Sequence, residues 1–96
     1  MKSNATFKFR LYVAAGTSNS IQALANLTSI CKKHIPDRYE IEVINVFKES
    51  KRALEDGIFM TPTLVKFAPS PVQHIVGNLV QSEIVMHALE MENSIL

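Results

Sequence analysis

The chain has few cysteines and glycines and no long apolar run, and each absence excludes a class of protein. Cys31 is the single cysteine among 96 residues, so no disulfide can form within the chain. The three glycines are far apart, so no glycine-rich phosphate-binding loop is present. No stretch approaches the ~20 apolar residues that cross a membrane, and residues 1–10 lack the apolar run of a signal peptide. We therefore expect a cytoplasmic protein with no membrane contact.

Strong charge of either sign is also missing. Ten Lys and Arg residues face nine Asp and Glu residues, which gives a net charge of +1. Nucleic-acid-binding domains usually carry a larger basic excess, so no nucleic-acid partner is expected. The three histidines, His34, His74 and His87, have no zinc-ligand spacing. The sequence therefore predicts no metal and no cofactor.

What is present fits one small globular domain. Apolar residues make up 47% of the chain, which is enough to form a core at this length. We take residues 1–96 as a single domain and expect its ends, 1–6 and 93–96, to be flexible.

The order of apolar patterns predicts an α/β fold. Alternating or β-branched segments predict strands, and apolar spacings of three or four predict helices. The expected strands are 7–13, 39–47, 63–67 and 72–76, and the expected helices are 21–35, 49–56 and 81–91. A long helix between the first two strands makes them parallel, and a short connection makes the last two antiparallel. This β-α-β-α-β-β-α order, with a mixed four-stranded sheet covered by three helices, is the thioredoxin-like architecture.

The first helix has a predicted apolar stripe and a predicted cap. Ser18, Asn19 or Ser20 can cap its start through a side-chain oxygen. The stripe consists of Ile21, Leu24, Leu27, Thr28, Cys31 and Ile35. Cys31 lies in register with the leucines, so it is expected in the core as a small apolar residue rather than as a reactive thiol.

The junction of the first strand with the first helix is where a thioredoxin-like enzyme keeps its reactive cysteines. Here it reads Gly16-Thr17-Ser18-Asn19-Ser20. Since serine cannot form a mixed disulfide, dithiol chemistry at this place is excluded. The Thr61-Pro62 pair precedes the third strand, where thioredoxin-like folds hold a cis proline beside that junction. We expect a cis bond, and the alternative is a trans proline that begins an edge strand.

Several segments, in order, resemble the KaiB family. Leu11-Tyr12-Val13-Ala14 with Thr17-x-Asn19-Ser20 resembles the family's LYVAG-x-T-x-NS, and residues 42–46 (EVINV) resemble KVIDV. Residues 53–56 with Thr61-Pro62-Thr63-Leu64-x-Lys66 resemble AEED…ATPTL-x-K. Residues 69–72 and 75–79 resemble PPPV and IIGDL. The resemblance runs from about residue 7 to residue 90.

The resemblance implies an adaptor rather than an enzyme. KaiB proteins bind the hexameric RecA-type ATPase KaiC in circadian timing, and in full clocks they sequester KaiA. They also switch folds, because a resting tetramer arranges the C-terminal half differently from the thioredoxin-like monomer. The implied partner here is a KaiC-like ATPase, with self-association to a dimer or tetramer. The alternative fold is the resting arrangement.

The resemblance also suggests a partner-binding surface on the first helix and second strand. The matching positions are Lys66, Gln22, Glu42 and Gln73, of which only the first is basic. Family members often carry basic residues there, and fewer positive charges weaken attraction to an acidic partner. One alternative is therefore a thioredoxin-like stress or regulatory protein that no longer binds KaiC. Another is a glutathione-dependent transferase module using Ser20 or Thr17, although the chain lacks the helical domain that completes such sites.

The C-terminal segment departs from the family in a way that bears on the fold switch. The family's GLDLLY appears as Ala88-Leu89-Glu90-Met91-Glu92-Asn93. Alanine in place of glycine favours helix by up to ~1 kcal/mol. We identify Ala88, Glu90 and Asn93 as the fold-switch region, and we expect the thioredoxin-like state to be more populated here than in clock KaiB.

Overall fold

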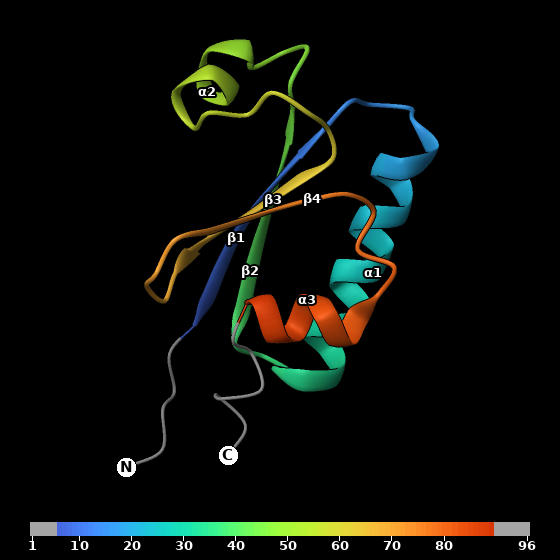
Figure 1. Ribbon diagram of the computed structural model, residues 1–96, viewed down its shortest axis with the longest axis vertical. Helices are drawn as coiled ribbons and strands as arrows, with labels where there is room; N and C mark the ends of the chain where they lie inside the picture. Colours follow the sequence, from blue (N-terminus) through green and yellow to red (C-terminus); the bar gives the residue numbers. More distant parts are fainter. Residues whose placement is uncertain (1–5, 90–96) are drawn as a thin grey trace.

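The computed structural model describes residues 6–89, which form one mixed sheet and three helices (Figure 1). In chain order the elements are β1 (Phe7–Val13), α1 (Ser18–His34), β2 (Tyr39–Asn45), α2 (Ser50–Glu55), β3 (Thr63–Ala68), β4 (Gln73–Val76) and α3 (Ser82–Ala88). The predicted order of elements is confirmed. No helix among the described residues is both long and apolar enough to span a bilayer.

The sheet has the strand order β2-β1-β3-β4. β1 runs parallel to β2 and antiparallel to β3, and β3 runs antiparallel to β4. The predicted parallel and antiparallel pairs are both confirmed. β1 and β3 are the central strands, which explains why most of their side chains are buried.

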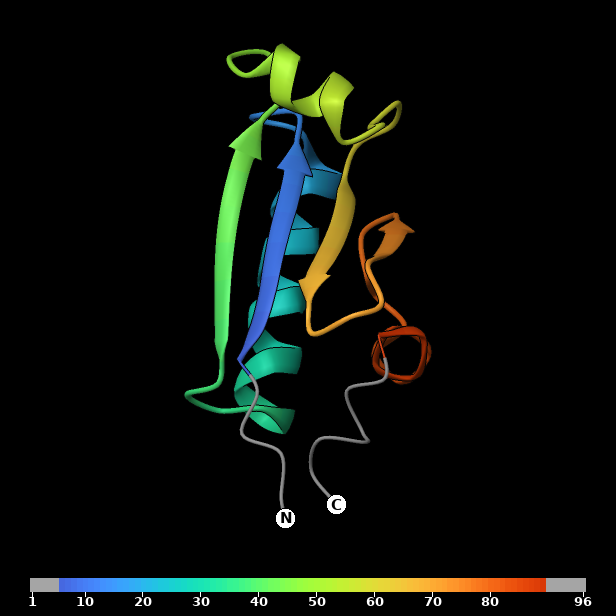
Figure 2. The same ribbon diagram turned by 90° about the vertical axis from the view of Figure 1, so that its left-hand side faces the viewer.

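The helices divide between the two faces of the sheet. α1 and α3 cover one face, while α2 lies over the ends at which β1 and β2 finish, toward the other face (Figures 1 and 2). The larger core lies under α1 and α3 and includes Phe9, Leu11 and Leu27. The smaller core lies under α2 and consists of Tyr12, Ile44, Ala53, Ile58 and Val65.

α1 does not bury the stripe that the sequence predicts. Its buried residues are Ser20, Ala23, Leu27, Ile30 and Cys31, whereas Ile21 is exposed and Leu24 is 36% exposed. The predicted stripe is therefore wrong for Ile21 and Leu24, and it is correct for Leu27, Cys31 and Ile35. The reason is that Ser20 and Ala23 face inward here, with the Ser20 oxygen bound to the Ala14 amide at the end of β1, so Ile21 and Leu24 lie on the outer side of the helix.

The predicted cap of α1 was also wrong. The cap position is Thr17, which makes no side-chain capping bond, and residues 18–20 already lie within the helix. The Thr17 hydroxyl instead donates to the carbonyl oxygen of Ala14 at 2.8 Å.

β2 ends at Asn45, two residues before the predicted end. The Asn45 side-chain oxygen accepts a hydrogen bond from the Phe47 amide at 3.0 Å, and its carbonyl accepts from the amides of Lys48 and Glu49. Such Asx-type bonding offers the backbone a turn in place of the ladder. Phe47 therefore leaves the sheet.

The turns around β3 are rich in proline. The Thr61–Pro62 bond is cis, as predicted, and the Ala68–Pro69 and Ser70–Pro71 bonds between β3 and β4 are cis as well. α3 ends at Ala88, so the described part of the C-terminal half has the thioredoxin-like arrangement rather than the alternative resting one. Glu90 and Asn93 lie outside the described residues, as do most of the ends predicted to be flexible.

Candidate partner-binding surface

The β1–α1 junction holds its hydroxyl groups in structural hydrogen bonds. The Ser20 oxygen accepts a hydrogen bond from the Ala14 amide at 3.1 Å, and Ser20 is buried. The Thr17 hydroxyl donates to the carbonyl oxygen of Ala14. Both side chains thereby fix the turn from strand to helix, and neither is disposed as an activated nucleophile.

Cys31 lies in the core, as predicted, on the sheet-facing side of α1. Burial raises the pKa of its thiol to about 12, because the apolar surroundings disfavour the thiolate. The thiolate is the reactive form of cysteine, so this thiol is held in an inert state.

We therefore expect Cys31 in the folded protein to react with an aromatic disulfide reagent on the order of 100-fold more slowly than in urea at neutral pH. The measurement is the absorbance of the released thiol over time. Rapid native labelling at the unfolded rate would contradict the buried placement.

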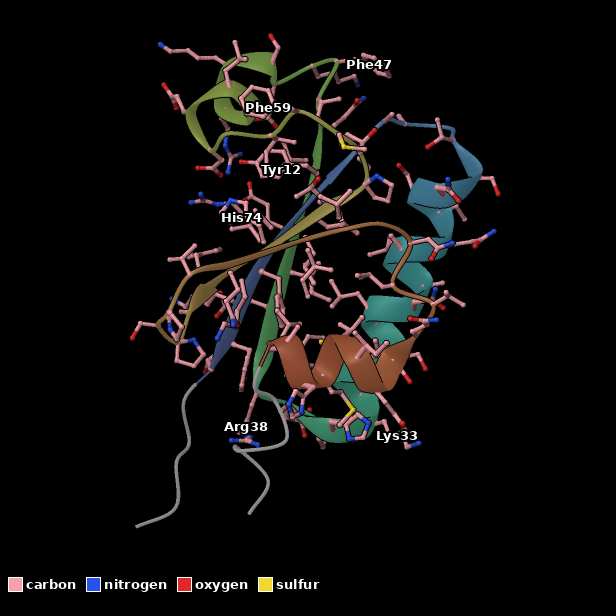
Figure 3. The ribbon with its side chains drawn as sticks, in the orientation of Figure 1. Tyr12, Lys33, Arg38, Phe47, Phe59 and His74 are labelled. Carbon is pink, nitrogen blue, oxygen red and sulfur yellow. The ribbon has the colours of Figure 1, made fainter. Side chains whose placement is uncertain are left out.

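An apolar hollow lies beside this junction, between the end of β2 and the segment that leads from α2 to β3. Its volume is about 210 Å³, and its lining includes Phe47, Phe59, Met60 and Thr61. Phe59 is 85% exposed, Phe47 74% and Met60 63%. Figure 3 places Phe47 and Phe59 at the same end of the molecule, opposite Lys33 and Arg38. We call Phe47, Phe59 and Met60 the apolar end surface.

A network of polar side chains lies next to this surface, between the sheet and the end of α2. The Tyr12 hydroxyl donates a short hydrogen bond to Asp56 Oδ2, and Arg10 Nη1 donates to the same oxygen at 3.0 Å. His74 Nε2 lies 3.3 Å from the Asp56 carbonyl oxygen. Residues of β1, β4 and the end of α2 therefore meet at Asp56.

The charges in this network shift the pKa values of its members. The hydrogen bond from Tyr12, helped by Arg10, lowers the pKa of Asp56 below its ordinary value against the opposing effect of burial. Burial first, and then the Asp56 carboxylate, raises the pKa of Tyr12 to about 12. At neutral pH the network therefore consists of an ionised Asp56 and a neutral Tyr12.

A second ion pair ties α2 to β2. Arg52 donates two parallel hydrogen bonds to the Glu42 carboxylate, at 2.8 and 2.9 Å, and one to Glu49 at 3.1 Å. These bonds lower the pKa of Glu42 and raise that of Arg52. Because the pair is exposed, its main effect is to orient α2 rather than to add much stability.

The structure does not bring the four predicted partner-binding residues onto one surface. Gln22 lies exposed on α1, where it accepts a hydrogen bond from Asn78 at 3.1 Å. Glu42 lies on the α2 face of the sheet, paired with Arg52. Lys66 and Gln73 are neighbours across β3 and β4.

Lys66 departs most from its predicted place. Its side chain is 1% exposed, with Nζ 3.4 Å from the Leu89 carbonyl oxygen and 5.9 Å from the centre of the Phe7 ring. The reason is that β3 is a central strand and α3 covers this side of it. Lys66 is therefore a residue of the interior in this conformation and not a surface contact.

The sequence reasoning missed the apolar end surface and the network under it. Phe47 lies within the predicted second strand, and Phe59 and Met60 fall between the predicted helix 49–56 and the predicted strand 63–67. One signal was present: Phe59 and Met60 follow Gly57 outside any periodic pattern, so nothing predicted a core partner for them. Among residues 6–89, no group of three or more His, Cys, Asp or Glu side chains is placed to hold a metal.

Comparison with known proteins settles the family. The model of the KaiB domain matches residues 10–91. The chain belongs to the KaiB family. Its relatives include the circadian clock protein KaiB3 of Synechocystis sp., which is 39% identical over 85% of this chain and 80% of its own length. The circadian clock oscillator protein KaiB of Nostoc punctiforme is 40% identical over 95% of this chain and 88% of its own.

The solved structures that resemble this KaiB-family chain have the thioredoxin-like fold. The N-terminal domain of Synechococcus elongatus SasA superposes with a TM-score of 0.74 and 18% identity, over all of this chain and 94% of that one. Chloroplastic thioredoxin z gives a TM-score of 0.73 and 18% identity, over 92% of this chain and 80% of that one. The predicted fold class is therefore confirmed. Both sequence relatives named above are circadian clock proteins.

Proposed function

We propose that this protein is a non-enzymatic, cytoplasmic KaiB-type adaptor that binds a KaiC-like RecA-type ATPase through its thioredoxin-like state. The observation that carries the proposal is the apolar end surface beside a junction that has no thiol. Large exposed apolar groups that gather at one place mark interaction sites, and aromatic residues often dominate the energy of an interface. Phe47, Phe59 and Met60 meet both conditions.

The charges around this surface fit a partner without strong net charge. Residues 46–56, which run from the loop before α2 to the residue after it, carry equal numbers of basic and acidic side chains: Lys48, Lys51 and Arg52 against Glu49, Glu55 and Asp56. Apolar contact rather than long-range attraction then supplies most of the affinity. This agrees with the absence of basic residues at Gln22, Glu42 and Gln73.

The test is a calorimetric titration of the chain into the KaiC-like ATPase of its host, in ATP and in ADP. We expect saturable binding in at least one nucleotide state. Bovine serum albumin, titrated in the same way, controls for unspecific apolar contact. Absence of binding in every nucleotide state would reject the adaptor function.

The alternative is a regulatory or stress-related protein of the same fold that does not bind this ATPase. Glu42 supports this alternative, because its exposed carboxylate stands at a position where the family resemblance leads us to expect a basic side chain. Size-exclusion chromatography before the titration would also reveal self-association to a dimer or tetramer, which the family resemblance implies.

A further inference from the structure

The apolar end surface depends on a segment that has few side chains in the core. Residues 57–60 connect α2 to the turn before β3, and of these only Ile58 is buried. Its amide donates to the Ala53 carbonyl oxygen at 2.8 Å, and the Gly57 amide donates to that of Leu54 at 3.0 Å. These bonds join the segment to α2, so its position over the sheet follows the position of α2.

Asp56 connects this end of α2 to the sheet. Its carboxylate accepts hydrogen bonds from Tyr12 and Arg10 on β1, while its carbonyl oxygen lies beside His74 on β4. Figure 3 shows Tyr12 and His74 on the sheet beneath the segment that carries Phe59. Phe59 is only three residues from Asp56, and the two residues between them are hydrogen-bonded to α2.

We propose that Asp56 is the positioning residue of the apolar end surface, and that its bonds to Tyr12 and Arg10 hold Phe59 and Met60 in the arrangement that the partner binds. The proposal rests on the proposed adaptor function. A surface that is ordered before binding loses less conformational freedom on association, so its affinity is higher. Asp56 itself need not touch the partner.

The charged groups around Asp56 determine how this arrangement responds to pH. Arg10 and Tyr12 face it from β1, His74 from β4, and Arg52 from α2, while Glu42 on β2 pairs with Arg52 and lies 3.9 Å from Arg10. The pKa of Asp56 is lowered in the folded state, so its bonds stabilise the fold fully above the ordinary pKa of aspartate. That stabilisation is lost as the pH falls below about 4 and through the lowered value.

The test uses the full chain with Asp56→Asn, which removes the charge but keeps the shape. Native-state amide exchange is measured at Ile58 and, as an internal reference, at Leu11 of β1. We expect exchange at Ile58 to become on the order of 10-fold faster while Leu11 changes little, because a charged hydrogen-bond acceptor is lost locally. Affinity for the ATPase should fall on the order of 10-fold at neutral pH.

Two further variants sharpen the result. Asp37→Asn makes the same chemical change at an exposed carboxylate in the turn between α1 and β2, and it should leave exchange at Ile58 and ATPase binding unchanged. Asp56→Glu keeps the charge and should restore part of both. In wild type, but not in Asp56→Asn, the Ile58 amide resonance should shift with acid together with the Asp56 carboxyl resonance.

Unchanged exchange at Ile58 in Asp56→Asn would overturn the proposal, whatever the ATPase does. Faster exchange with unchanged ATPase affinity would overturn it as well, because the segment would then move without consequence for binding. Failure of the wild-type chain to bind the ATPase would reject the adaptor function instead, and amide exchange would still decide whether Asp56 holds the segment.

Discussion

Replacing Leu27 with alanine is expected to lower the free energy of unfolding by about 3 kcal/mol. Leu27 is fully buried between α1 and the sheet, in the larger core. Removal of its side chain loses the transfer free energy of the deleted groups and leaves a cavity that close-packed neighbours fill only in part. For a domain of this size, the loss is a large fraction of the total stability.

The matched control is Leu24→Ala, which makes the same change one turn earlier on α1. Leu24 is 36% exposed, so the expected loss is under about 1 kcal/mol. Urea unfolding followed by circular dichroism measures both variants. Equal losses would mean that α1 presents the predicted stripe of Ile21 and Leu24 to the core, contrary to the structure.

Replacing Phe59 with serine is expected to weaken binding of the KaiC-like ATPase by about 2 kcal/mol, or roughly 30-fold. Phe59 is among the most exposed large apolar residues of the described chain, and it lines the hollow beside the β1–α1 junction. Its removal takes an aromatic anchor from the interface while the free energy of unfolding changes by only about 0.5 kcal/mol.

The control for this prediction is Ile84→Ser on α3, where another apolar residue is 62% exposed but lies on the opposite side of the sheet. It should leave ATPase binding unchanged. Titration calorimetry measures the affinity of each variant, and urea unfolding confirms that each is folded. If Ile84→Ser weakened binding and Phe59→Ser did not, the partner would bind the α1–α3 side instead.

The elements of the fold could be predicted because their signals are local. The alternation in residues 39–45 indicates a strand wherever its partners lie, and the glycine at 57 ends a helix through its own φ of +72°. Parallel pairing of β1 with β2 follows from the length of the connection between them. The cis bond at Thr61–Pro62 was predictable only from its place before the third strand of a thioredoxin-like fold, because the local sequence does not fix the isomer of an X-Pro bond.

The candidate site was less predictable because its parts come from distant positions. Tyr12 and Asp56 are 44 residues apart, and nothing in either local sequence indicates the other. Their hydrogen bond forms because the fold brings the end of α2 next to β1. Lys66 was misplaced for the same reason: a charged residue in a strand is expected at the surface unless another element covers it, and α3 does so here.

The β-α-β-α-β-β-α order, the absence of a dithiol at residues 17–20 and the resemblance to the KaiB family are all visible in the sequence, because they depend on local pattern and on which residue types are present. Three features became visible only in the packed chain: the buried side of α1, the interior position of Lys66, and the meeting of Phe47, Phe59 and Met60 near the network centred on Asp56. The exposure of a side chain and its hydrogen-bond partners are set when distant segments of the chain pack together. No single segment of the sequence therefore encodes them.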